Sequence, residues 1–424
     1  MLRRAFVFLH RWVGLAMAAF LIVEGATGSV LAFEDDIERL VAPQLYATPK
    51  PGAARLDVAT LAEKVSEHEP KARLAYFFAY EKQILANCAP RDDPATGPYE
   101  LGFNQMFLDP WTGAELGRRK FGDLSQGMVN FIPFIYELHM SLALGEWGHW
   151  TLGVVALLWT LDSFYAFYLT MPTTPAAFWR RWELAWLVKW RAGAFRLNFD
   201  LHRAGGLWLW PLLIVFGWSS VMFNMSSVYQ PTMRLLFDYE DFGKVLAPLF
   251  QRAKATPRLD WRGAQAVGEK LVAEQAQKRG FKLGAPGMFG YMPEVGAFTY
   301  GVQSSLDVQR RAWNTGVWFD GDTGELIHAF APSGEHAGNT MECWLRALHF
   351  ADVFGLRSYR ILVCALGLVI VMLSVTGVYI WWKKRRARKL RVKSGARRGL
   401  VEAEIASERS SFPNFNSLNR RRPT

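Results

Sequence analysis

The sequence contains few cysteines, and they form no motif that attaches a cofactor. Only Cys88, Cys343 and Cys364 are present, and because no C-x-x-C-H motif occurs, a covalently attached c-type haem is excluded. A glycine-rich nucleotide fingerprint after an expected strand is also missing, so no flavin or nicotinamide domain of that kind is expected. The cysteine pattern leaves a disulfide between Cys88 and Cys343 open.

Apolar residues are abundant but unevenly distributed. They make up 51% of the 424 residues, and mean hydropathy is +0.03, which is too apolar for a soluble protein and too polar for one wholly within a membrane. Four runs reach the roughly 20 residues that a membrane-spanning helix needs. They cover residues 12–33, 149–171, 207–229 and 360–382. The first run carries Glu24 and lacks a small-residue cleavage pattern, so we interpret it as a span and not as a signal peptide.

The net charge of +11 is concentrated in three places. Lysine and arginine gather at the N-terminus, in residues 180–203 and in the tail after residue 383, whereas the two long segments between spans are slightly acidic. By the positive-inside rule, both termini and the middle loop are cytoplasmic and both long segments lie outside. We expect a multi-pass membrane protein whose basic tail contacts anionic lipid and not nucleic acid.

The chain contains two copies of one unit. Four motifs recur in the same order: H-R-x-x-G-L at His10 and His202, R-L-D at Arg55 and Arg258, D-x-x-T-G at Asp109 and Asp320, and L-H-x5-G at His139 and His349. Each unit has two spans, so both copies have the same orientation and are related by a pseudo-two-fold axis along the membrane normal. His10 should therefore face His202, and His139 should face His349.

Each long segment is expected to form a small, separate α+β domain with a helix followed by a hairpin. The predicted order is a first span (1–33), an outer domain (34–135), a lead-in and second span (136–171), a cytoplasmic loop (172–201), a third span (202–229), a second outer domain (230–344), a lead-in and fourth span (345–384), and a disordered basic tail (385–424). The loop should contain an interfacial helix carrying Trp179, Trp182, Trp186 and Trp190.

Two histidine pairs related by symmetry suit the axial ligation of haem. Neutral imidazoles on both faces of a porphyrin leave no open iron position, which favours electron transfer over oxygen activation. Zinc or copper is the competing interpretation, but it would need further ligands, and none lies near either pair in the sequence. Arg11 and Arg203 directly follow the His10–His202 pair and are expected to bind haem propionates.

Three further polar residues lie at membrane depth or at its edge. His149 has Tyr359 as its counterpart in the other unit, so we interpret it as an interfacial or propionate-side histidine, with replacement of His139 as the alternative. Glu24 and Asp162 are carboxylates inside expected spans, where an unpaired charge is unfavourable. Both are expected to be structural or proton-linked and not to ligate iron.

These motifs resemble those of the PepSY-associated transmembrane proteins. The resemblance rests on the H-R-x-x-G-L starts, the Glu24–Gly28 element, the L-H-x5-G elements and the D-x-x-T-G hairpins, and it extends to about Lys384. Within the family, the chain is similar to FoxB-type siderophore reductases of the bacterial inner membrane. The resemblance implies two haem b groups with axial ligands His10, His139, His202 and His349, and reduction of a ferric siderophore on the periplasmic side.

The chain departs from the family pattern at two places. Met140 and Phe350 follow the histidines where arginine is common, so Arg346, Arg357 and Arg360 are substitutes for contacting propionates. Ser163-Phe164 occupies a position where the family often has a T-G element like Thr376-Gly377.

The electron donor is expected to be a separate protein, a quinol or a small reductant. The candidate contacts for the siderophore are Tyr136, Trp147, His336 and Trp344.

Two other function classes remain at this point. The protein could instead be a non-redox membrane protein whose outer domains bind or regulate an envelope peptidase or bind peptidoglycan. Passage of the chelate through the protein is a third interpretation, which four helices disfavour.

Overall fold

The computed structural model describes residues 1–93, 95–311 and 315–410, and the chain divides into two compact units. The first unit comprises Met1–Leu169 and Leu209–Val371, and the second comprises Thr170–Trp208 and the chain from Met372 onward.

Among the described residues, three helices are long and apolar enough to cross a membrane. They are α1 (Leu2–Leu31), α5 (Glu146–Thr170) and the Arg357–Arg391 part of α13 (Arg357–Ser410). The third expected span is broken, because α7 (Ala194–Trp208) ends before α8 (Trp210–Asn224) begins. Pro211, which has no N–H and cannot continue a preceding helix, explains the break. The number of candidate spans is therefore three, or four if the broken pair is one span.

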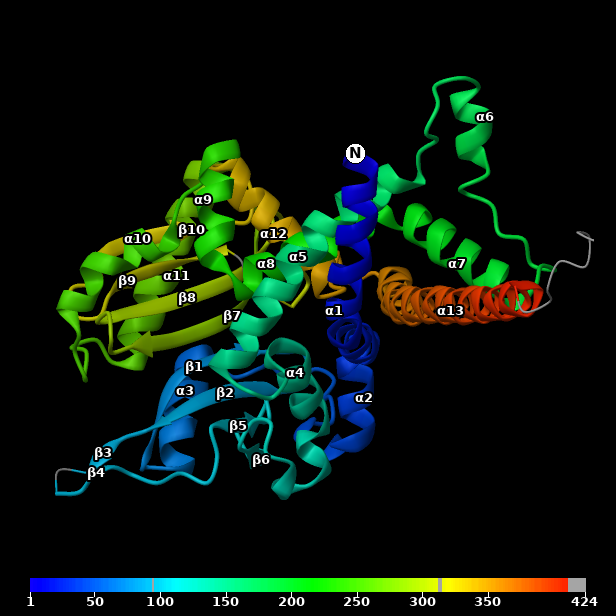
Figure 1. The fold of residues 1–424 in the computed structure, drawn as a ribbon. Helices are drawn as coiled ribbons and strands as arrows, with labels where there is room; N and C mark the ends of the chain where they lie inside the picture. The colour runs from blue at the N-terminus through cyan, green and yellow to red at the C-terminus, as the bar shows by residue number, and fades with distance from the viewer. Residues whose placement is uncertain (94, 312–314, 411–424) are drawn as a thin grey trace, which may run out of the picture. The chain divides into compact units, whose positions relative to one another are not determined.

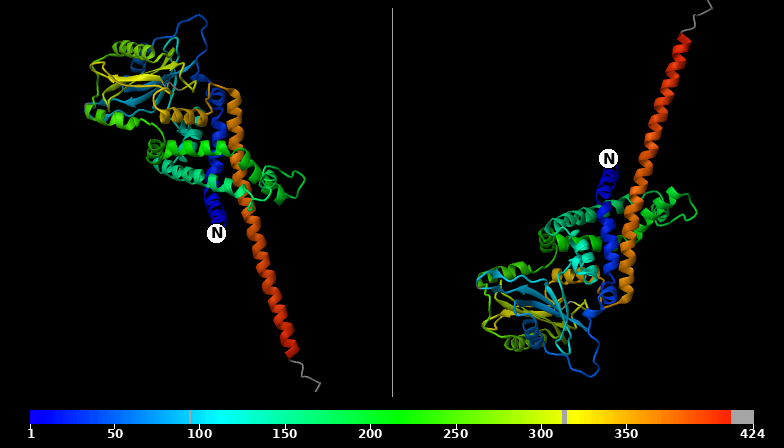
Figure 2. Two further views of the ribbon diagram at one scale, coloured as in Figure 1. Left: turned by 90° about the horizontal axis from the view of Figure 1, so that it is seen from above. Right: turned by 90° about the horizontal axis from the view of Figure 1, so that it is seen from below.

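Small residues allow α1 and the start of α13 to pack closely (Figure 2). A Cβ on Gly25 would lie 2.6 Å from the carbonyl oxygen of Gly367, and a Cβ on Gly367 would lie 2.3 Å from the Ser29 hydroxyl. The Ser29 hydroxyl itself donates to the carbonyl of Cys364 across this contact, at 3.0 Å. Close approach over small residues is the usual way in which membrane helices associate, because lipid tails are as apolar as the side chains.

The two long segments form one sheet and not two separate domains (Figure 1). The first contributes β1 (Ala72–Ala79), β2 (Ile84–Pro90), β5 (Gln105–Leu108) and β6 (Glu115–Arg119), and the second contributes β7 (Leu283–Met292), β8 (Ala297–Ser304), β9 (Thr315–Asp320) and β10 (Leu326–Phe330). The strand order is β10-β9-β8-β7-β1-β2-β5-β6. Antiparallel pairing of β1 with β7 joins the halves and satisfies two strand edges that separate domains would expose.

One face of this sheet carries its hydrophobic core. The helices α3 (Val58–His68) and α11 (Trp261–Arg279) cover this face, where Phe77 of β1 packs against Phe289 of β7.

The two halves of the sheet contain the same helix caps and turns. Asp57 and Asp260 cap the N-termini of α3 and α11, and the side chains of Asp109 and Asp320 accept backbone N–H groups in the two D-x-x-T-G turns. The predicted hairpin turns are therefore present.

The remaining elements are short. They are α2 (Glu34–Val41), η1 (Pro43–Leu45), β3 (Asp92–Asp93), β4 (Gly97–Pro98), η2 (Leu124–Gln126), η3 (Met128–Asn130), α4 (Phe131–Ser141), α6 (Phe178–Glu183), α9 (Ser226–Leu236), α10 (Phe242–Leu246), η4 (Ala247–Arg252) and α12 (Ala337–His349). Cys88, Cys343 and Cys364 are all free thiols.

Two sequence predictions about the second unit were wrong. The tail from residue 385 is helical as far as Ser410, in keeping with its content of the helix formers Arg, Lys, Ala and Glu, and the rest of that prediction lies outside the described residues. The tryptophan helix is also shorter than expected. Only Trp179 and Trp182 lie on α6, because the chain unwinds after it and the side chain of Arg203 donates to the freed carbonyls of residues 184, 185 and 187.

We expect Gly290→Val to destabilise the sheet at its central junction. A Cβ there would lie 2.3 Å from the carbonyl oxygen of Ala75 and 2.5 Å from the Cβ of Tyr76. Overpacking of this kind costs about 1–3 kcal/mol, and each kcal/mol lowers the melting temperature by about 2–4 °C in a domain of this size. Thermal unfolding of the purified protein measures the loss. Gly102→Val, with no heavy atom within 4 Å, is the matched control, and equal melting temperatures for the two variants would contradict the close junction.

Candidate functional site

The structure brings His139 and His349 together in the first unit. His139 lies in the last turn of α4, and His349 is the final residue of α12. Their ring centroids are 6.1 Å apart, with 56° between the ring planes. Left-handed residues end both helices soon afterward, at Leu142 and Ala351, so the two L-H-x5-G motifs form similar turns. The predicted pairing of these histidines is thus present in the geometry.

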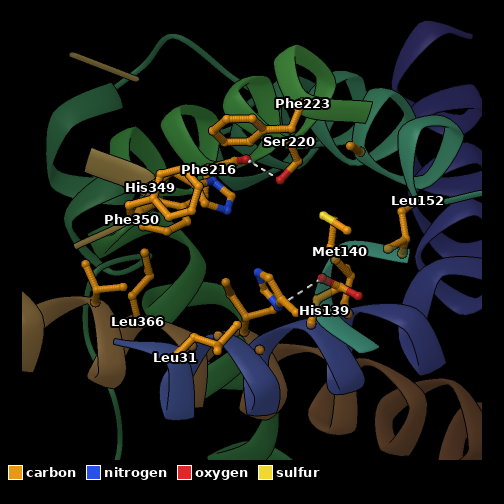
Figure 3. A pocket seen from close by; sticks show the side chains of 18 of the residues that line it. Leu31, His139, Met140, Leu152, Phe216, Ser220, Phe223, His349, Phe350 and Leu366 are labelled. Carbon is orange, nitrogen blue, oxygen red and sulfur yellow. Dashed lines mark hydrogen bonds and ion pairs between the residues drawn. The ribbon is translucent and has the colours of Figure 1, made fainter. Parts of the chain in front are cut away.

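Both imidazoles point into a cavity of about 240 Å³ (Figure 3). Its wall is mainly apolar and is built from α1, α4, α5, α8, α12 and α13. The side chains that enclose it include Leu31, Met140, Leu152, Phe216, Phe223, Phe350 and Leu366. Phe216 stacks on His349 with centroids 5.1 Å apart, which fixes the plane of that imidazole. An apolar cavity with two converging imidazoles is suited to a flat, largely apolar group.

A hydroxyl holds Nδ1 of each histidine. Nδ1 of His139 lies 2.9 Å from the Thr27 hydroxyl, and Nδ1 of His349 lies 2.7 Å from the Ser219 hydroxyl. Each hydroxyl also donates to a carbonyl of its own helix, Val23 or Phe216, so it must accept from the histidine. Both imidazoles therefore carry their proton on Nδ1, which leaves the lone pair of Nε2 for a ligand.

These hydroxyls were missed as a pair at the level of sequence, although a signal was available. Thr27 follows His10 by 17 residues, and Ser219 follows His202 by the same 17 residues. They are therefore equivalent positions in the two copies of the unit. Mutation of a residue that orients a metal-binding histidine in this way typically lowers metal affinity about 10- to 100-fold.

Glycine makes room for two of the histidines. A Cβ on Gly28 would lie 3.1 Å from Cε1 of His139, and a Cβ on Gly377 would lie 3.2 Å from Cε1 of His202. In both places a threonine precedes the glycine and its hydroxyl contacts Nδ1 of the same histidine. In each T-G element the threonine therefore hydrogen-bonds Nδ1 of the imidazole, and the glycine, which has no side chain, allows the ring to approach closely.

Burial keeps the paired histidines neutral. It lowers the pKa of His139 to about 4 and the pKa of His349 to about 3, the latter lowered further by the neighbouring His139. Glu24 Oε2 lies 3.2 Å from Nδ1 of His139, whereas its Oε1 is buried without a hydrogen-bond partner in the described part of the chain. Glu24 therefore contacts His139 through Nδ1 and not through Nε2.

The other predicted pair is divided between the two units, and each histidine is anchored within its own. Nδ1 of His10 lies 2.8 Å from Oδ2 of the buried Asp162. Nδ1 of His202 lies 2.9 Å from the carbonyl oxygen of Leu373 and 3.2 Å from the Thr376 hydroxyl. As with the first pair, a neighbouring helix occupies Nδ1. The partly buried Arg11 lies next to His10 on α1.

Arg203 does not have the position expected of a group that contacts a cofactor. It donates to the carbonyls of Leu184 and Ala185, and it forms an ion pair of 2.9 Å with the fully buried Asp200. Its guanidinium therefore stabilises the turn after α6 and neutralises a buried carboxylate. The expectation that it binds a propionate is replaced by this structural role.

His149 lies in the same cavity as the histidine pair. Its Nδ1 lies 2.9 Å from Oδ1 of Asn224, and its counterpart Tyr359 donates instead to the carbonyl of Leu348. The sequence analysis separated His149 from the pair, and the structure places all three histidines in the wall of one cavity. Among the residues that the structure describes, no group of three or more histidine, cysteine, aspartate or glutamate side chains is arranged to hold a metal ion.

The remaining candidates are dispersed. Arg360 is nearly buried beside Asp35 and Asp36, Arg346 pairs with Glu342, and Arg357 is 83% exposed. Of the four predicted siderophore contacts, only Tyr136 lines the histidine cavity. Trp147 is 82% exposed, His336 bonds Asp238 at 3.0 Å, and Trp344 packs edge-on against Phe354.

The apolar helices and the single sheet define a membrane protein with a sheet-containing region and a histidine pair in an apolar cavity. The chain belongs to the family described as the PepSY-associated TM region, whose model matches residues 7–384. A comparison with curated proteins found no significant match.

We expect Arg203→Ala to destabilise the second unit by about 1–3 kcal/mol, because it removes a hydrogen-bonded partner of the buried Asp200 carboxylate and leaves the more exposed Arg196 as its ion-pair partner. Arg196→Ala removes the other partner of Asp200, whose side chain is 48% exposed, and should cost at most about 1 kcal/mol. The rate of proteolytic cleavage within residues 172–193 measures the difference. Similar rates in the two variants would contradict the structural role of Arg203.

Proposed function

We propose that the protein is a membrane reductase with two haem b groups, which passes electrons to a ferric siderophore on the periplasmic side of the bacterial inner membrane. The observation that carries the proposal is the His139–His349 pair, with Nδ1 of each ring occupied and the ring centroids 6.1 Å apart. An imidazole nitrogen binds a metal at about 2 Å, and the ring centre lies about 1 Å behind it, so two rings on opposite sides of one iron have centres about 6 Å apart. The residues present therefore fit a haem between them.

The second haem would be held by His10 and His202, the equivalent residues of the two repeats. The contacts of Nδ1 in both histidines support this assignment. Nδ1 of His10 is directed at Asp162 Oδ2 and Nδ1 of His202 at the Leu373 carbonyl, as is usual for imidazoles that bind a metal.

Haem supplies one-electron transfer when it is bound, and the protein supplies orientation and exclusion of water. Thr27 and Ser219 fix the tautomer of the His139–His349 pair, and the apolar wall keeps both imidazoles neutral. His139 and His349 would both hold the iron of this haem, so a chelate would dock elsewhere on the protein. The electron donor would be a separate protein, a quinol or a small reductant.

We expect His139→Ala and His349→Ala to lose one and the same haem, and His10→Ala and His202→Ala to lose the other, because each haem takes one ligand from each repeat. Haem content per chain and the reduced absorption spectrum of the purified variants measure this. His336→Ala, which removes a partly exposed histidine bonded to Asp238, is the matched control and should retain both haems.

Two outcomes would count against the proposal. Loss of different haems in His139→Ala and His349→Ala would overturn the pairing. A wild-type protein purified without any Soret band would overturn the reductase itself and favour a non-redox protein that binds or regulates an envelope peptidase.

A further inference from the structure

A second and larger cavity lies on the opposite face of the sheet from α3 and α11. Its volume is about 720 Å³, within the usual range for a site that binds a small molecule. Tyr76 and Phe78 of β1 line it, whereas Phe77 between them belongs to the core on the other face, as the alternation of a strand requires. We call it the sheet cavity. It contains no histidine and is separate from the apolar cavity between His139 and His349.

The sheet cavity shares part of its wall with the histidine cavity. Glu34, the first residue of α2, and Tyr136 of α4 line both. A molecule in the sheet cavity would therefore be separated from the histidine cavity by little more than these side chains. This placement suits a docking site for a molecule that receives an electron without reaching the iron.

The charge of the wall favours an anion. Eight basic and five acidic side chains line the sheet cavity. Burial raises the pKa of one of the acids, Glu34, to about 7, although the neighbouring Arg311 lowers it. A fraction of the Glu34 side chains is therefore protonated and uncharged near neutral pH. Two arginines at the rim are weakly engaged: Arg310 is 3.9 Å from Glu81, and Arg357 is 3.6 Å from Asp36, with side chains 65% and 83% exposed.

Two further arginines, Arg311 and Arg360, line the sheet cavity. Their terminal nitrogens contact Glu34, Asp35 and Asp36, which hold the two guanidinium groups in place. Guanidinium groups fixed in this way recognise carboxylate and catecholate oxygens by charge-assisted bonds.

Aromatic side chains complete the wall. Tyr76 and Phe78 contact each other edge-on with centroids 5.4 Å apart, and Phe121 packs against Tyr136 at 5.9 Å. Aromatic rings next to arginine suit a ligand that is itself planar and aromatic, because ring faces and guanidinium planes both stack on it.

We infer that the sheet cavity binds the ferric chelate, and that this chelate is anionic, with catecholate or carboxylate oxygens around the metal. The inference rests on the proposed function for the identity of the metal, but the cavity and its charge stand independently. Fe(III) in the chelate accepts one electron from the reduced protein and becomes Fe(II), with no other bond made or broken by the protein. In this proposal the chelate docks in the sheet cavity and not on the surface around Trp147, His336 and Trp344.

The test uses gallium, because Ga(III) has the charge and coordination of Fe(III) but is not reduced under these conditions. Binding of gallium tris-catecholate to the full-length protein in detergent is measured by calorimetry. The double variant Arg310→Ala/Arg357→Ala should weaken binding about tenfold or more, since each arginine supplies a charge-assisted contact. Arg262→Ala is the matched control, because Arg262 is 59% exposed and pairs with Glu63 on the helix-covered side of the sheet. It should leave binding unchanged.

A second probe tests the chemical class of the ligand. A gallium trihydroxamate without net negative charge should bind at least tenfold more weakly than the tris-catecholate. Equal affinity for the two probes would overturn the anionic class, and unchanged affinity in the double variant would overturn the site.

The iron chelate separates this inference from the proposed function. If gallium tris-catecholate binds in a manner that depends on Arg310 and Arg357 but reduced protein does not transfer electrons to the iron chelate, the site stands and the reductase fails. If the iron chelate is reduced at the same rate by the wild type and the double variant over a range of low chelate concentrations, the reductase stands and the site is wrong.

Discussion

The structure depends on how each histidine is held through Nδ1. His139 and His349 use the hydroxyls of Thr27 and Ser219, His10 uses the carboxylate of Asp162, and His202 uses the carbonyl of Leu373. Each of these contacts joins two helices, so the position of an imidazole requires the packing of the helix beside it. A buried nitrogen that lost such a partner would cost about 1–3 kcal/mol. Each contact through Nδ1 is therefore a constraint on how the two helices that it joins are packed.

The two halves of the sheet use the same local structural features. Both halves begin with an aspartate that caps a helix, and both end with a D-x-x-T-G turn closed by a glycine at positive φ. Yet the halves are not independent, because β1 and β7 pair across Gly290, where a side chain would collide with the facing strand. The junction gives the sheet one continuous face beneath the helices and another that is lined by charge. Both cavities lie within the first unit as a result.

Local signals in the sequence predicted local structure well. The hairpin turns and the pairing of His139 with His349 were predicted from repeated motifs, and the structure has both. The single sheet was not predictable in this way, because alternation within a strand does not say which strand lies beside it. The break at Pro211 was readable but was outweighed by the apolar run around it. The structural role of Arg203 could not be predicted from the sequence. Its guanidinium bonds the carbonyl of Leu184, which is available because α6 ends at Glu183.

Electron paramagnetic resonance of the oxidised, purified protein tests the central claim most directly, because the signal of ferric haem reports both spin state and axial ligands. Two neutral imidazoles held on either side of one iron leave no weak or vacant axial position. The account predicts low-spin ferric signals of the two-histidine type, with little or no high-spin iron. A predominantly high-spin signal, which requires an open or weakly held axial position, or a protein without haem would contradict it.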